Sequence, residues 1–234
     1  NHQIYTWYKY KKNAQIIKIK KGEDKALQFI EKKFKEFKTP SPKIIYDLAN
    51  IYKNFGKFEQ SIKYYTEVLN KLEKDTSSYA DTLYRRGGSY ERIENFEMSD
   101  RDLLDALIIS PNDPYILNYL AYSWLERGIN LQTSIDMLTR AYKNNENNAY
   151  ITDSLGWAYY LAGNFILAEK YINQALQIRP NDPVIMDHYG DILWMLNKKL
   201  QAKYYWKNII KHKNLDDLDE DEIKFKVLKG LNKS

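Results

Sequence analysis

The chain has 234 residues, of which 44% are hydrophobic and 29% charged, with no cysteine and a formal net charge of +5. Without cysteine it can form neither disulfides nor thiolate metal sites, and this fits a reducing or an oxidising compartment equally well. No segment approaches the roughly 18 to 20 consecutive apolar residues of a membrane-spanning helix. The first residue is Asn1 rather than methionine. We therefore expect a trimmed or processed product.

Small residues recur at a fixed interval in the carboxy-terminal half. Gly156 and Gly190 are 34 residues apart, and so are Ala168 and Ala202. Small side chains at matching places let two helices approach closely, while large neighbours fill the space beside them. The interval therefore predicts a stack of two-helix copies, each about 34 residues long.

The first copy, residues 7–41, is degenerate and strongly basic. Residues 1–43 contain twelve lysines and four acidic residues, a net charge of +8, which leaves −3 for the rest of the chain. Such a cluster attracts anionic surfaces, but it also fits the solvated face of an amphipathic helix. Nucleic acid is an unlikely ligand, because the aromatic residues Tyr5, Trp7, Tyr8 and Tyr10 precede the dense lysine run instead of alternating with it.

Five further copies follow in chain order, at residues 42–75, 80–113, 114–148, 149–182 and 183–216, and a capping helix is expected at about 219–230. Proline marks the copy boundaries at 111–114 and 180–183, since it ends one helix and is tolerated at the start of the next. Four extra residues, Thr76–Tyr79, indicate either a soft joint in the array or a longer helix end.

The pattern resembles the tetratricopeptide repeat family over nearly the whole chain. Its carriers are LNYLAYSWLERG at 117–128 and ITDSLGWAYYLAGNFILAEKYINQAL at 151–176. The resemblance implies an all-α, right-handed solenoid of about six repeats in a single domain, residues 1–234. The last three copies are also similar to repeats of Gram-negative envelope proteins, including lipoprotein adaptors of carboxy-terminal processing proteases. That narrower likeness favours a periplasmic or outer-membrane-associated location over the cytoplasm.

The resemblance also implies a concave groove that binds a protein or peptide partner. In the family, the second, fifth, ninth and twelfth residues of each first helix line this groove. Transferred to the last three copies, these positions place aromatic and polar side chains on one surface: Asn118, Tyr122, Asp153, Trp157, Tyr160, Asp187, Asp191 and Trp194. Aromatic side chains concentrate binding energy at interfaces. Ordinary core packing is the alternative for the two tryptophans, and solvent exposure without a partner is the alternative for the polar residues.

Catalysis has little support in the sequence. The three histidines, His2, His188 and His212, are isolated, and no phosphate-binding loop or paired zinc-binding histidines are present. We therefore expect no enzyme, no cofactor and no metal, and a protein-binding adaptor or scaffold as the function. Two alternatives stay open. One is a self-assembling structural repeat protein that forms homo-oligomers, and the other is an anchoring module whose lysine-rich first repeat meets an anionic surface.

Overall fold

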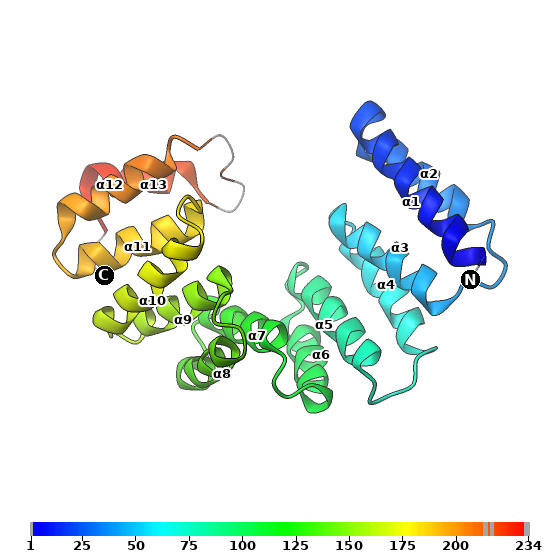
Figure 1. The fold of residues 1–234 in the computed structure, drawn as a ribbon, viewed down its shortest axis with the longest axis horizontal. Coiled ribbons are helices and arrows are strands. Elements are labelled where there is room, and N and C mark those ends of the chain that lie inside the picture. The colour runs from blue at the N-terminus through cyan, green and yellow to red at the C-terminus, as the bar shows by residue number, and fades with distance from the viewer. Residues whose placement is uncertain (1, 213–214, 216–217, 232–234) are drawn as a thin grey trace. The chain divides into compact units, whose positions relative to one another are not determined.

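The structure is a computed structural model that describes residues 2–212, 215 and 218–231. These residues form thirteen α-helices and no strand. The chain divides into two compact units, Asn1–Pro111 and Asn112–Ser234. Each unit consists of two-helix hairpins packed side by side (Figure 1). The expected single domain of residues 1–234 therefore stays a prediction.

The first unit contains three hairpins. Its helices are α1 (His2–Lys21), α2 (Glu23–Phe34), α3 (Pro42–Asn54), α4 (Phe58–Leu69), α5 (Ser77–Glu91) and α6 (Phe96–Ile109). Helix α1 begins before the first expected copy, which starts at residue 7. Trp7 is 1% exposed and packs edge-on against Phe34 and Phe37, which anchors α1 to the end of α2 and the residues that follow it.

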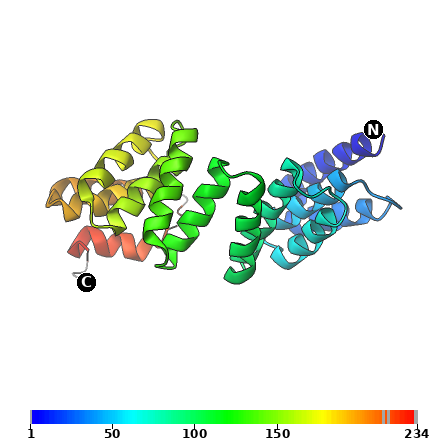
Figure 2. The same cartoon turned by 90° about the horizontal axis from the view of Figure 1, so that it is seen from below.

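The second unit contains three hairpins and a final single helix. Its helices are α7 (Pro114–Glu126), α8 (Leu131–Asn144), α9 (Ala149–Leu161), α10 (Phe165–Ile178), α11 (Pro183–Met195), α12 (Lys199–Ile209) and α13 (Glu220–Lys229). Helix α13 packs beside α12, as both views show (Figures 1 and 2). Residues 213, 214 and 216, at the end of the last expected copy, lie outside the described residues.

Side-chain caps explain where several helices begin. Asp113 accepts hydrogen bonds from two backbone N–H groups of α7, Asp182 does the same for α11, and a proline follows each as the first helical residue. Asp219 caps α13 in the same way. The prolines at the copy boundaries therefore act together with an aspartate cap.

The four extra residues before the third copy belong mostly to a longer helix. Thr76 is the cap of α5, its Oγ1 accepting a hydrogen bond from the Tyr79 N–H at 3.2 Å, and Ser77 is the first helical residue. Of the two interpretations left open by the sequence, the structure shows the longer helix end.

Close helix approach accounts for the recurring glycines. A Cβ added to Gly156 would lie 2.7 Å from Ile172, and one added to Gly190 would lie 2.3 Å from Trp206. In both copies the contact joins residues 16 positions apart, from the first helix to the second. Because real Cβ atoms do not approach this closely, glycine at this position allows a large residue of the second helix to pack against the first helix.

Candidate functional site

The eight residues predicted to line a groove lie on the first helices of the three hairpins in the second unit. Asn118 and Tyr122 are on α7, Asp153, Trp157 and Tyr160 are on α9, and Asp187, Asp191 and Trp194 are on α11. The structure shows that several of them contact one another and the capping helix α13.

Asp153 pairs with a histidine of the next hairpin. Its carboxylate oxygens lie 2.9 and 3.0 Å from Nδ1 of His188, and both residues are buried. Burial disfavours the imidazolium, but the neighbouring Asp153 carboxylate more than offsets this, so the pKa of His188 is raised. The pair therefore ties α9 to α11 by a buried, charge-assisted hydrogen bond.

Trp157 lies in a three-ring stack. Its ring centroid is 4.2 Å from that of His188 and 4.6 Å from that of Tyr160, and the planes deviate by 14° in each case. Burial and the nearby Asp191 raise the pKa of Tyr160 to about 12. Because Trp157 and Tyr160 are only half-buried, the stack presents a rigid aromatic surface on α9.

Two carboxylates of α11 bind a lysine of the capping helix. Lys226 Nζ lies 2.9 Å from Asp187 Oδ2 and 3.1 Å from Asp191 Oδ2, and all three residues are buried. Asp191 Oδ1 also accepts a hydrogen bond of 3.1 Å from the Trp206 indole N–H. Burial and the adjacent Asp187 charge raise the pKa of Asp191 to about 7, although Lys226 opposes this shift.

The end of α13 packs against Trp194. Gly230 follows α13 with a φ of 81°, and a Cβ there would lie 1.9 Å from the Trp194 ring. Lys199 lies 5.1 Å above the same ring, and Trp206 is 5.6 Å from it. Trp194 is therefore covered by the chain's own residues and takes part in packing.

Solvent exposure without a partner, the alternative for the polar residues, is wrong for Asp153, Asp187 and Asp191. Their exposed fractions are 4%, 8% and 6%. A buried carboxylate is costly unless it is paired, and each of these three has a cationic or N–H partner within the chain. Whether any of the eight residues binds a partner stays a prediction.

These contacts follow one rule that sequence reasoning missed. At three junctions the fifth residue of one copy contacts the sixth residue of the next: Asp153 contacts His188, Lys11 Nζ lies 2.6 Å from Asp47, and Arg85 lies 5.8 Å from the Tyr46 ring centroid. The residue types at these two positions are complementary in charge or in cation–ring pairing, and this could have predicted the contacts from the sequence. Lys226 of α13 makes a similar contact with Asp187, although it is the seventh residue of its helix and not the sixth.

The part of the predicted surface that lies on α7, formed by Asn118 and Tyr122, makes no ion pair of this kind among the described residues. Tyr122 is half-buried, and burial raises its pKa together with the nearby Glu126 carboxylate. Asn118 Oδ1 accepts no hydrogen bond from the part of the chain that the structure describes. Tyr115 and Tyr150, at the second positions of these copies, are 52% and 48% exposed. The surface of α7 and α9 is thus rich in accessible aromatic side chains.

Two further features are absent among the described residues, a metal-binding cluster and a membrane-spanning helix. No group of three or more His, Cys, Asp or Glu side chains is placed to hold a metal ion. None of the helices is long and apolar enough to cross a membrane.

Family models match two segments of the chain. Two family models, both described as tetratricopeptide repeat, match residues 42–70 and 150–182. The chain contains tetratricopeptide repeats. Its all-α hairpins, the packing glycines and the capping helix are those of a tetratricopeptide solenoid, as the resemblance in the sequence predicted. Such repeats generally mediate protein–protein interactions.

Known tetratricopeptide proteins from bacteria share this sequence or fold. The TPR repeat-containing protein PA4667 of Pseudomonas aeruginosa is 28% identical over 139 residues, which cover 59% of this chain and 22% of that protein. This chain therefore matches only about a fifth of that relative's length. The envelope-protease adaptor resemblance finds no support in these comparisons and stays a prediction.

Solved structures show the same fold. A tetratricopeptide repeat protein from Parabacteroides merdae superposes with a TM-score of 0.66 at 15% identity, covering 90% of this chain and 81% of that one. PilF of Pseudomonas aeruginosa has a TM-score of 0.65 at 15% identity, covering 75% and 78%. MamA from Desulfovibrio magneticus has a TM-score of 0.62 at 15% identity, covering 76% and 97%.

Proposed function

We propose that this chain is a non-catalytic adaptor that binds a peptide segment of a partner protein on the surface of α7 and α9. The observation that carries the proposal is the set of accessible aromatic side chains on these two helices, including Tyr122, Trp157 and Tyr160. Large aromatic side chains lose little entropy on binding and supply most of the energy at protein interfaces.

The capping helix limits the surface that a partner can reach. Lys226 already satisfies Asp187 and Asp191, and Gly230 covers Trp194. We therefore assign partner binding chiefly to Asn118, Tyr122, Trp157 and Tyr160, and we assign Asp153, Asp187, Asp191 and Trp194 to the support of this surface. The hairpins beneath it are rigidly packed, so little ordering entropy is lost when a segment docks.

The envelope is the compartment that the resemblance of the last three repeats favours. We propose a role in a bacterial envelope complex, in which this chain holds one protein near another. In that role any catalytic step belongs to the partner.

A site-specific cross-linking experiment tests the groove. A photoreactive residue replaces Tyr160, and in a control it replaces Ile166, which is 69% exposed on α10. A partner cross-linked from position 160 and absent from position 166 is then purified, and its affinity is measured by calorimetry. The proposal expects the Tyr122→Ala/Trp157→Ala variant to bind at least tenfold more weakly at unchanged helical content. Equal affinity for parent and variant would exclude the surface of α7 and α9.

Anchoring is a second candidate function, favoured by one observation on α1. The apolar residues Ile4, Ile16 and Ile19 are 44%, 50% and 86% exposed among the lysines of this helix. Exposed apolar residues flanked by lysines fit the boundary of an anionic bilayer. Co-sedimentation with vesicles containing anionic lipid, at low and high salt, tests it. Binding that is absent at low salt would exclude it.

A further inference from the structure

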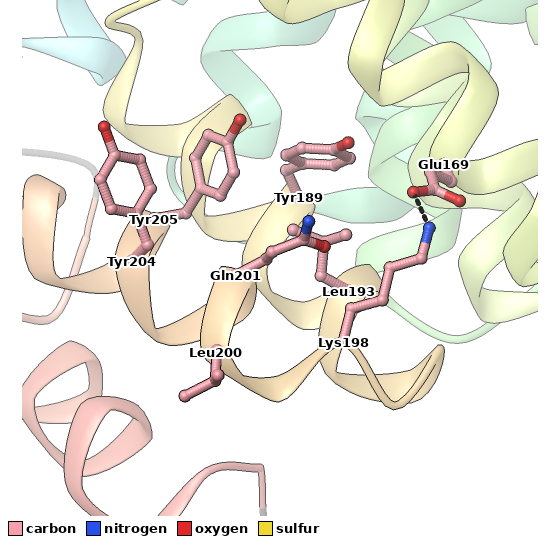
Figure 3. A pocket seen from close by; sticks show the side chains of 8 residues that line it. All are labelled: Glu169, Tyr189, Leu193, Lys198, Leu200, Gln201, Tyr204 and Tyr205. Atoms are coloured by element: carbon pink, nitrogen blue, oxygen red, sulfur yellow. Dashed lines mark hydrogen bonds and ion pairs between the residues drawn. The ribbon is translucent and has the colours of Figure 1, made fainter.

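The outer surface of the last hairpin carries a pocket that the proposed adaptor function does not use. It has a volume of about 450 Å³ and is lined by residues from α10, α11 and α12 (Figure 3): Glu169, Tyr189, Leu193, Lys198, Leu200, Gln201, Tyr204 and Tyr205. A second pocket of about 430 Å³ lies next to it and shares Tyr204 and Tyr205. The tyrosine pair therefore separates two adjoining hollows.

The tyrosines are held in place by one another. Tyr205 lies edge-on to Tyr189 at 4.8 Å and edge-on to Tyr204 at 5.6 Å. Tyr204 is 63% exposed. An exposed ring fixed beside a half-buried one is preorganised for contact with another molecule.

Basic side chains outnumber acidic ones around the pockets, where Glu169 is the acidic residue among those that line them. Residues 198–212 contain five lysines and no acidic residue: Lys198, Lys199, Lys203, Lys207 and Lys211. Lys198 is paired with Glu169 at 2.5 Å on the rim of the first pocket, and Lys211 lines the second. Lys207 is exposed on α12. The excess of lysine therefore favours a ligand that carries negative charge.

We infer that the tyrosine-lined pockets of α12 form a second binding surface, which takes an acidic peptide segment with one aromatic or aliphatic anchor. The anchor enters the first pocket, against Leu193 and Tyr204, and the flanking carboxylates face Lys207 and Lys211. A hollow of this size suits a side chain, whereas a flat polyanion would leave it empty.

The inference is tested with a fluorescein-labelled peptide in which one phenylalanine stands between two runs of three acidic residues. Fluorescence anisotropy measures its affinity for the full chain. We expect Tyr204→Ala to weaken binding at least tenfold, and Tyr204→Phe to retain most of the affinity because the ring remains. Lys207→Glu/Lys211→Glu should abolish binding, and raising the salt concentration should weaken binding to the parent.

Matched controls separate this surface from the rest of the chain. Tyr115→Ala removes a tyrosine of similar exposure on α7, and Lys143→Glu/Lys170→Glu makes the same change of charge on α8 and α10. Both should bind the peptide as the parent does, and so should Trp157→Ala, which isolates the result from the proposed groove. Circular dichroism confirms that each variant is folded.

Three outcomes would overturn the inference. The first is that heparin, or a peptide in which alanine replaces the phenylalanine, binds as tightly as the original peptide and that Tyr204→Ala has no effect. The surface would then attract any polyanion. The second is undiminished binding by Lys207→Glu/Lys211→Glu. The third is sedimentation velocity in which the parent self-associates and Tyr204→Ala does not, because the surface is then an interface between copies.

Discussion

Lys226 Nζ lies 2.9 Å from Asp187 Oδ2, although 39 residues separate the two in the chain. The contact joins the capping helix α13 to α11 inside the second unit. With Asp191 it forms a buried group of two carboxylates and one ammonium, so the lysine neutralises charge that would otherwise be unfavourable.

Replacing Lys226 by methionine should strongly destabilise the second unit. The change leaves Asp187 and Asp191 buried without their cation, and removing one partner of a buried ion pair costs about 3 to 5 kcal/mol. Urea unfolding followed by circular dichroism measures the loss. Lys224→Met is the control on the same helix, because Lys224 pairs only with exposed carboxylates and its loss should leave the unfolding midpoint nearly unchanged. Similar midpoints for the two variants would contradict this account of α13.

The buried carboxyl of Asp191 should make stability depend on pH. Its pKa is about 7 in the folded protein against an ordinary value of 3.8. Between these values the folded state binds more protons than the unfolded state, so the contribution of Asp191 to stability falls as the pH rises from about 4 to about 7. Thermal unfolding of Asp191→Asn should show a flatter pH dependence over this range than the parent. Asp113→Asn, which preserves a helix cap, should retain the parent's profile.

The contribution of His188 to stability also falls as the pH rises, but over a higher pH range than that of Asp191. Its pKa is raised above the ordinary value of 6.5. The stabilisation from its pairing with Asp153 is therefore complete below pH 6.5 and is lost as the pH rises through the folded value. Above pH 6.5 the melting temperature of a His188→Gln variant should therefore fall less steeply with pH than that of the parent. An unchanged decline would show that the imidazolium does not contribute.

Gly190→Ala tests the close approach of α11 and α12. The added Cβ would lie 2.3 Å from Trp206 Nε1, so the helices must separate or the indole must move. Overpacking of this kind costs about 1 to 3 kcal/mol. The measured quantity is the free energy of unfolding. In a Trp206→Leu background the same substitution should cost much less, and equal costs in both backgrounds would exclude the indole contact.

Arg86→Lys should destabilise the first unit. Arg86 Nε and Nη2 each lie 2.7 Å from one carboxylate oxygen of Asp102, which is 2% exposed. Lysine retains the charge but cannot form both bonds in this planar arrangement. We expect a loss of about 1 to 3 kcal/mol in the free energy of unfolding, since an unmade hydrogen bond to a buried carboxylate costs that much. Arg92→Lys, an exposed site, is the control.

The recurring residues were enough to predict the hairpins. Gly156 and Gly190, the boundary prolines and the small residues of the second helices indicate a two-helix repeat, because close packing admits few residue types at these places. The burial of the carboxylates in the candidate site could not be predicted in this way. Polarity suggested exposure for Asp187 and Asp191, but their state depends on Lys226, whose distance along the chain does not follow the repeat interval.

Contacts between the fifth residue of one copy and the sixth of the next have a consequence for rearranged versions of this chain. The partners differ from junction to junction: a lysine meets an aspartate at one, a tyrosine meets an arginine at another, and an aspartate meets a histidine at a third. A copy moved to a new place would bring Asp153 opposite Asp47, or Lys11 opposite Arg85. The copies share one backbone arrangement, but the contact residues of each copy are complementary only to those of its own neighbour.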